Sequence, residues 1–173
     1  MSRSVLVNGR ILGDDGLVEG LAVVVDGERI AALVPAHEAS VGGARKRDLG
    51  GGILAPGFID CQVNGGSGVL FNDSPSVDSI RRIAAAHRRF CTTGLLPTLI
   101  TDTTAAMQAA IDAVGDAIEQ GVPGILGIHL EGPFLATQRR GIHDASKFRA
   151  PDATDIEREI GRASCRERVL RLV

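Results

Sequence analysis

The spacing of hydrophobic positions changes at about residue 54. Before that point, short β-rich runs alternate with turn signals, and Val25–Arg29, with Asp26-Gly27 inside it, predicts a hairpin. A polar stretch over residues 44–48 and three glycines over residues 50–52 then mark a boundary. We therefore predict part of a small β-sandwich domain over residues 1–53.

After residue 54 the pattern predicts strands that alternate with helices. The helices have apolar residues at helical spacing: Ile80, Ile83, Ala84 and Phe90 in the first, and Met107, Ala110, Ile111, Val114 and Ile118 in the second. Glycine follows each helix, as is common at helix ends. The predicted order is strand 57–64, helix 76–93, strand 95–100, helix 103–120 and strand 125–130. Alternation of this kind favours an α/β class with a parallel sheet, open or closed into a (β/α) barrel.

The third strand brings a carboxylate to its carboxyl end. Its residues are almost wholly apolar, which predicts a strand covered on both faces. Alternation places His129 and Glu131 on one side and Leu126, Ile128 and Leu130 on the other. A buried carboxylate needs a partner, so Glu131 is either half of an ordinary salt bridge or a metal ligand.

The first strand ends in polar residues that face the same edge. Asp60, Gln62 and Asn64 share one face of it, at the end where a (β/α) barrel has its active site. Together with Glu131, these oxygen donors fit part of a divalent-metal site; alternatively, Gln62 and Asn64 are a pair of satisfied polar residues that cap a turn. The glycine-rich segment 65–68 is either a ligand cradle or a tight loop.

The loop that follows the third strand carries further polar candidates. His143 is either a substrate contact or a solvated histidine, and Arg139 and Arg140 are either a phosphate site or a solvated basic pair. Neither His37 nor His87 is assigned a role.

Composition limits the possible partners. The 173 residues carry a net charge of −2, with 44% hydrophobic residues and no tryptophan or tyrosine. This composition predicts no nucleic-acid partner. The absence of a long apolar run and of a signal-peptide pattern predicts no membrane partner and a cytoplasmic location. The three cysteines have no zinc or disulfide spacing.

The motifs, taken in order, resemble a known family. Pro-Gly-Phe-Ile-Asp from Pro56, Gln-Val-Asn-Gly-Gly from Gln62 and His-Leu-Glu-Gly-Pro-Phe from His129 resemble N-acetylglucosamine-6-phosphate deacetylases, members of the amidohydrolase superfamily. The resemblance runs from about residue 5 to 158. It implies that residues 54–159 form about the first three strands of a (β/α)8 TIM barrel.

The resemblance also implies roles for individual residues. Glu131 is implied to bind a single divalent metal ion, zinc or iron. Gln62 and Asn64 stand where the wider superfamily has two metal-binding histidines, so they are implied to contact the metal at most weakly or only through one of its ligands. Ile142 and His143 are implied to contact the sugar phosphate.

The implied reaction is hydrolysis of the acetamide of N-acetylglucosamine 6-phosphate to glucosamine 6-phosphate and acetate, in amino-sugar catabolism. In that chemistry the metal makes a water acidic enough to attack the amide carbonyl. A carboxylate on a later strand then moves its proton to the leaving amine. The partners are a small amino-sugar phosphate and, for the full-length parent, a homo-oligomer.

The family's later motifs are not found in this sequence. Two further metal histidines, a carbonyl-polarising histidine and the catalytic aspartate would follow, so we expect an N-terminal fragment that holds no catalytic residue and is inactive alone. Residues 160–173 resemble a translated sequencing adapter and are interpreted as an artefactual tail; the alternative is an arginine-rich amphipathic tail. Two other functions stay open: another amidohydrolase, such as a cyclic-amide hydrolase, and a non-catalytic module that binds a sugar phosphate or a protein.

Overall fold

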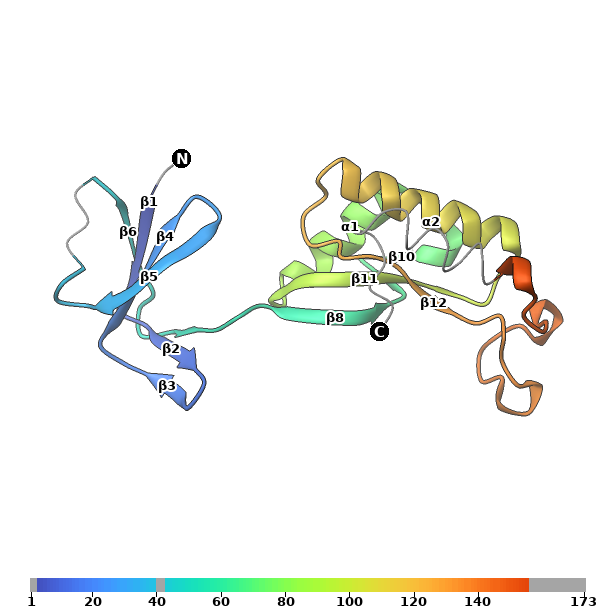
Figure 1. Ribbon diagram of the computed structural model, residues 1–173, viewed down its shortest axis with the longest axis horizontal. Coiled ribbons are helices and arrows are strands. Elements are labelled where there is room, and N and C mark those ends of the chain that lie inside the picture. The colour runs from blue at the N-terminus through green and yellow to red at the C-terminus, as the bar shows by residue number, and fades with distance from the viewer. Residues whose placement is uncertain (1–2, 40–42, 156–173) are drawn as a thin grey trace. The chain divides into compact units, whose positions relative to one another are not determined.

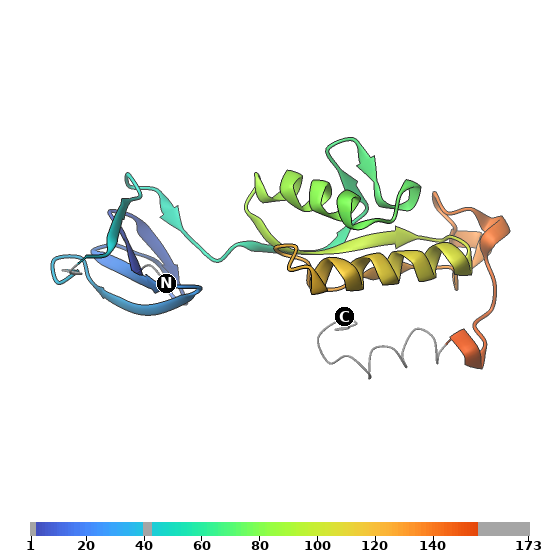
Figure 2. The ribbon, with the colours of Figure 1, turned by 90° about the horizontal axis from the view of Figure 1, so that it is seen from above.

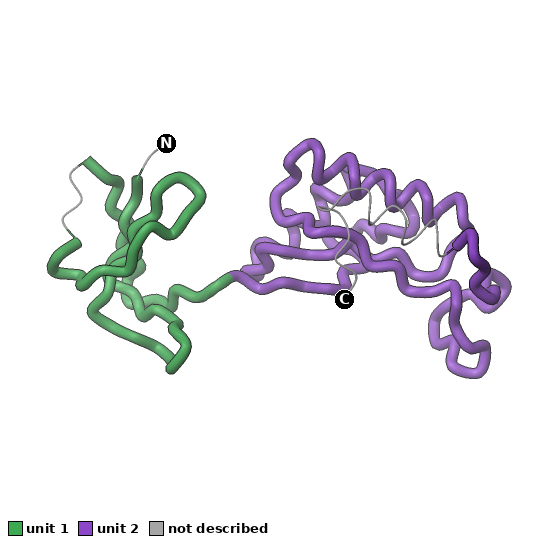
Figure 3. Tube along the Cα trace, in the orientation of Figure 1, with its two compact units in different colours: residues 1–56 green, residues 57–173 purple. Residues whose placement is uncertain are grey.

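The computed structural model describes residues 3–39 and 43–155. The chain divides into two compact units, Met1–Pro56 and Gly57–Val173, drawn in different colours in Figure 3. The tail predicted over residues 160–173 lies outside the described residues.

The first unit consists of strands only. One sheet has the order β5-β4-β1-β6 and the other the order β3-β2-β7. The strands are β1 (Arg3–Val7), β2 (Arg10–Gly13), β3 (Gly16–Val18), β4 (Leu21–Asp26), β5 (Arg29–Pro35), β6 (Arg45–Asp48) and β7 (Ile53–Leu54). The predicted hairpin is confirmed, because Asp26 pairs with Arg29 across a two-residue loop in which Gly27 has a φ of 60°.

The core of the first unit is small. Its buried members are Val5, Val7, Ala22 and Val24, contributed by the two antiparallel neighbours β1 and β4. Large side chains of both sheets stay exposed, among them Leu12 and Leu33.

The second unit is built on a parallel sheet. Its order is β12-β11-β8, and β11 pairs in parallel with both neighbours. The strands are β8 (Phe58–Val63), β11 (Thr92–Ile100) and β12 (His129–Glu131), with a small hairpin of β9 (Gly65–Gly66) and β10 (Val69–Leu70) between the first two. This arrangement confirms the predicted α/β class and the partial (β/α) barrel.

Two helices cover one face of this sheet, as Figures 1 and 2 show from two directions. They are α1 (Val77–Arg88) and α2 (Thr104–Glu119). The predicted stripe of α2 is confirmed, because Met107, Ala110 and Val114 are buried in the main core. None of the helices in the described part of the chain has the length and apolarity to cross a membrane.

Side-chain caps begin both helices, and backbone geometry ends them. The hydroxyl of Ser76 accepts a hydrogen bond from the amide of Ser79, and Thr103 does the same for Ala106. The first helix ends five residues earlier than predicted, because Cys91 takes a left-handed φ of 68°. Phe90 is therefore 76% exposed and not part of the apolar stripe.

The third strand is shorter than predicted and is covered on one face. Only His129–Glu131 pair as a strand, and Ile125 makes an isolated bridge with Leu95 further back. Ile128 is buried and Leu130 packs against the core, but Leu126 is 46% exposed. The prediction of full burial was wrong because, in the described residues, helices pack on one face only.

A register shift between β8 and β11 lies next to the polar residues of β8. Leu95 pairs with Asp60 and Pro97 pairs with Val63, so β8 contains one extra residue between these pairs. The buried hydroxyl of Thr98 accepts the hydrogen bond of the Val63 amide at 2.9 Å. The side chain of Thr98 thus replaces a ladder hydrogen bond at the bulge.

Candidate functional site

Three side chains that lie far apart in the sequence meet at the carboxyl edge of the parallel sheet. Gln62 donates from Nε2 to Oε2 of Glu131 at 2.8 Å. On the other oxygen, Oε1 of Glu131 lies 3.3 Å from Nε2 of His143. The side chain of Glu131 is 31% exposed and that of His143 only 8%. The structure thus assembles three of the predicted site residues around one accessible carboxylate.

The sheet explains why these residues meet. Parallel strands end at a common edge, and Gln62 and Glu131 both lie at or next to the ends of their strands. His143 reaches the same edge from the loop after β12, where its amide donates to the carbonyl of Arg140. An apolar run that ends in a carboxylate was the sequence signal that located this edge.

Thr101, which the sequence did not single out, links this cluster to the backbone. Its buried hydroxyl lies 2.8 Å from Nδ1 of His143 and donates to the carbonyl oxygen of Glu131 at 3.3 Å. Gly132 packs against it: with a φ of 90°, any Cβ at this position would collide with the Thr101 hydroxyl. Only glycine allows this close approach.

An ion pair holds the loop after β12 to Asp102, the residue that follows Thr101. Nζ of Lys147 lies 2.8 Å from Oδ1 of Asp102, which also accepts from the amide of Thr103, while Asn72 donates to Oδ2. Burial raises the pKa of Asp102, but these hydrogen bonds outweigh it and hold the pKa below its ordinary value. The hydrogen bond and charge of Asp102 also raise the pKa of Lys147.

The other predicted residues lie outside the cluster. Ile142 is 87% exposed. Asn64 lies at the start of the β9–β10 hairpin, where its carbonyl accepts from the amide of Phe71, and Asp60 caps the amide of Gln62. His129 has its Nδ1 buried without a hydrogen-bond partner within the described ranges.

The donor set fits part of a metal site. Glu131 offers a carboxylate that is accessible and held in place, which suits a divalent cation. No group of three or more histidine, cysteine, aspartate or glutamate side chains is poised to hold a metal within residues 3–39 and 43–155. The described residues therefore supply one strong ligand and not a complete site.

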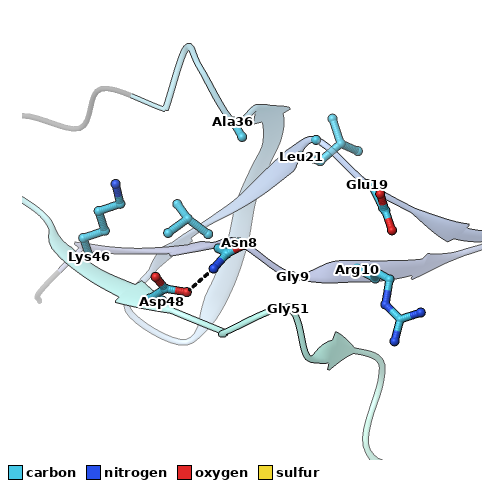
Figure 4. A pocket seen from close by; sticks show the side chains of 11 residues that line it. Asn8, Gly9, Arg10, Glu19, Leu21, Ala36, Lys46, Asp48 and Gly51 are labelled. Carbon is cyan, nitrogen blue, oxygen red and sulfur yellow. Dashed lines mark hydrogen bonds between the residues drawn. The ribbon is translucent and has the colours of Figure 1, made fainter.

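The first unit has a pocket of its own, of about 690 Å³, drawn in Figure 4. Arg10 and Lys46 line it together with Glu19 and Asp48, so cations and carboxylates are mixed. The backbone amide of Gly50 and the side-chain amide of Asn8 both donate to Oδ1 of Asp48, and these hydrogen bonds hold the pKa of Asp48 below its ordinary value. None of the predicted site residues lies in this pocket.

Comparison with known proteins gives the following matches. No protein-family profile matches the chain. An N-acetylgalactosamine-6-phosphate deacetylase of Shewanella sp. (strain ANA-3) is 52% identical over 101 residues, which are 58% of this chain and 26% of that protein. The N-acetylglucosamine-6-phosphate deacetylase of Haemophilus influenzae is 32% identical over 158 residues, 90% of this chain and 41% of that protein.

Solved structures give the same answer. The crystal structure of N-acetylglucosamine-6-phosphate deacetylase from Pasteurella multocida matches with a TM-score of 0.87 and 31% identity, covering 96% of this chain and 43% of that one. Together with the parallel sheet and the carboxylate at its carboxyl edge, these matches place the chain in the amidohydrolase superfamily. Within that class, the chain belongs to the N-acetylglucosamine-6-phosphate deacetylase family. It spans between about a quarter and two fifths of the length of these curated relatives.

Proposed function

We propose that this chain forms the N-terminal part of a metal-dependent deacetylase. The enzyme hydrolyses the acetamide of N-acetylglucosamine 6-phosphate to glucosamine 6-phosphate and acetate. One observation carries the proposal: Glu131 stands at the carboxyl edge of the sheet, between Gln62 and His143, in a chain similar to such deacetylases along 90% of its length.

Glu131 would hold one divalent cation, zinc or iron, through the carboxylate oxygen that faces His143. When bound, the cation polarises the amide carbonyl and makes a water molecule acidic. Gln62 keeps the other oxygen of Glu131 occupied, which fixes the direction of the carboxylate. As a neutral amide, Gln62 supports the ligand and does not bind a second metal.

The loop after Glu131 would contact the sugar phosphate. Ile142 is exposed and free to pack on a sugar ring, while the largely buried His143 presents one ring edge to the site. Lys147 and Asp102 hold this loop against the end of β11. Asn64, further from Glu131, is a weaker candidate for a contact with the metal or the substrate.

The chain alone would be inactive. Its described residues offer one metal ligand and, by resemblance, none of the family's later catalytic residues. The cytoplasmic location and the homo-oligomeric state of the full-length parent stay predictions. So do the absence of a nucleic-acid partner and of a membrane partner.

A second substrate has direct support. The relative with 52% identity is named as an N-acetylgalactosamine-6-phosphate deacetylase. The two sugars share the acetamide and the 6-phosphate and differ in the configuration of one ring hydroxyl. Relatives with both names match this chain, so the two substrates need to be compared directly.

The first experiment is to sequence the source gene across codons 155–173 and to express the protein that the full reading frame encodes. We expect the frame to continue, and we expect its product to release acetate from N-acetylglucosamine 6-phosphate, which the 173-residue chain does not. A product that binds amino-sugar phosphates without cleaving them would refute the proposal, as would one that opens cyclic amides instead.

A matched pair of variants then tests the metal ligand. Glu131→Gln should lower metal content and reduce kcat/KM more than about 100-fold, since even indirect metal contacts are worth about 10- to 100-fold. Glu38→Gln makes the same change at an exposed carboxylate of the first unit and should leave both unchanged.

A further inference from the structure

The glycine-rich segment after β8 folds into a tight hairpin that brings the chain back to the sheet. β9 and β10 pair across a two-residue loop, Ser67-Gly68, in which both residues have a positive φ, of 52° and 73°. A Cβ at Gly65 would collide with the carbonyl oxygen of Val69, so the two strands of the hairpin approach as closely as glycine allows.

The residue that this hairpin brings to the edge of the sheet is Asn72. Phe71 before it is fully buried, and its amide donates to the carbonyl of Asn64 at 2.8 Å, which anchors this point of the chain. Oδ1 of Asn72 accepts from the Ile100 amide and Nδ2 donates to the Ile100 carbonyl, both at 3.0 Å. Because a backbone N–H only donates and a carbonyl oxygen only accepts, these two bonds fix the orientation of the side-chain amide.

These two hydrogen bonds take the place of a neighbouring strand at the end of β11. Among the described residues, the ladder between β8 and β11 ends at the pair of Val63 and Pro97, so Ile100 lies beyond the reach of β8. On its other side, Ile100 is the register partner of Glu131. The Asn72 amide therefore satisfies the backbone of β11 at the level of the candidate metal ligand.

The same side chain reaches the loop after β12. Its Nδ2 also donates to Oδ2 of Asp102 at 3.3 Å, while Oδ1 of Asp102 accepts from Nζ of Lys147 and from the amide of Thr103. Lys147 belongs to the loop that carries Ile142 and His143, the proposed substrate contacts. The hairpin and the loop are thus joined through one carboxylate.

From this network we propose that Asn72 is a positioning residue that holds the end of β11 and, through Asp102 and Lys147, sets the position of the loop that contacts the sugar phosphate. Asn72 acts through this loop and does not touch the substrate. Its effect on the substrate rests on the proposed function, but its hydrogen bonds to Ile100 can be tested without catalysis.

Kinetics of the full-length enzyme test the positioning role. Asn72→Asp keeps the acceptor for the Ile100 amide, removes both donated hydrogen bonds and places a second carboxylate beside Asp102. KM should rise about tenfold, equivalent to one hydrogen bond to a charged group, because binding must then order the loop, while kcat and metal content stay within about twofold. Asn8→Asp is the matched control: Nδ2 of Asn8 also donates to a carboxylate, that of Asp48, at 2.8 Å in the first unit, and KM should stay unchanged.

A double variant separates positioning from a general loss of stability. Asn72→Asp combined with Asp102→Asn exchanges the two groups, so the amide at position 102 can donate to the carboxylate at position 72 while its oxygen still accepts from Lys147. KM should return to within about threefold of the parent value. A parental KM in Asn72→Asp alone would overturn the proposal, and so would a double variant whose KM is no lower than that of the single one.

Amide hydrogen exchange of the 173-residue chain tests the hydrogen bonds themselves. Asn72→Ala removes both bonds to Ile100, so the Ile100 amide should exchange about tenfold faster than in the parent, whereas in Asn72→Asp it should stay protected. Equal protection in Asn72→Ala would contradict the role at the strand end. If the exchange result holds and the full-length product shows no deacetylation, the proposed function fails and the role of Asn72 in the fold stands. If deacetylation occurs and KM is parental in Asn72→Asp, only the positioning role fails.

Discussion

The bulge between β8 and β11 gives the sharpest prediction about the fold beneath the site. Thr98 is fully buried, and its hydroxyl accepts from the Val63 amide at 2.9 Å while donating to the carbonyl of Leu96 at 3.2 Å. Pro97, the ladder partner of Val63, has no N–H to contribute to the ladder. Gln62 lies inside the bulge, so this hydrogen bond also fixes the direction of a site residue.

Replacing Thr98 with valine keeps the shape and removes the acceptor. The Val63 amide is buried, so leaving it without a partner should lower the free energy of unfolding by about 1–3 kcal/mol. Thr98→Ser is the matched control: it loses a methyl group, worth about 0.8 kcal/mol, and keeps the hydroxyl.

Urea unfolding measures the total effect, and amide hydrogen exchange locates it. In Thr98→Val the Val63 amide should lose protection selectively, whereas in Thr98→Ser it should stay protected. Our reasoning is wrong if the free energy of unfolding of Thr98→Val lies within about 0.5 kcal/mol of the parent's and the Val63 amide is still protected from exchange. The hydroxyl would then not stabilise the bulge.

Three further changes test the core, the backbone and the charges. Leu99→Ala removes a side chain that is 1% exposed and should cost about 2–5 kcal/mol in urea unfolding. Gly132→Ala should lower the thermal midpoint through its collision at a φ of 90°, whereas Gly115→Ala, in open helix surroundings, should stabilise by about 0.5–1 kcal/mol. The lowered pKa of Asp102 means stabilisation that is present above the ordinary value of 3.8 and is lost as pH falls through the lowered one. The thermal midpoint of the parent should therefore fall as the pH is lowered, and that of Asp102→Asn should fall less steeply. If the thermal midpoint depends on pH equally in both proteins, the ion pair with Lys147 does not contribute to stability.

Periodicity and strand-end logic predicted the larger features of the second unit. The alternation after residue 54 gave the parallel sheet, and the carboxylate after an apolar run located the edge at Glu131. Both features depend on local patterns that a sequence displays directly. The confirmed stripe of α2 has the same origin, since its spacing alone decides which side is buried.

The errors have physical reasons that the sequence did not display. Phe90 continues the helical spacing, but the backbone turns left-handed at Cys91 and leaves its ring outside. The apolar run predicts that Leu126 is buried, but its burial depends on which face of the sheet is covered, and Leu126 is exposed. Thr101 was missed because it contacts Glu131 and His143, which lie 30 and 42 positions further along the chain. Only the fold brings these residues together.

The order of the strands explains the choice of side chains at the site. The sheet runs β12-β11-β8, so the Gln62–Glu131 hydrogen bond crosses the middle strand. Neighbouring strands lie about 4.8 Å apart, so the backbones to be bridged are about 10 Å apart, which two long side chains can span and two short ones cannot. The middle strand contributes Thr101 just beyond its end, where a short hydroxyl reaches the backbone of Glu131 and the ring of His143. Long side chains on the outer strands and a short one on the inner strand therefore converge on a single carboxylate, and its direction is set by the register of the sheet.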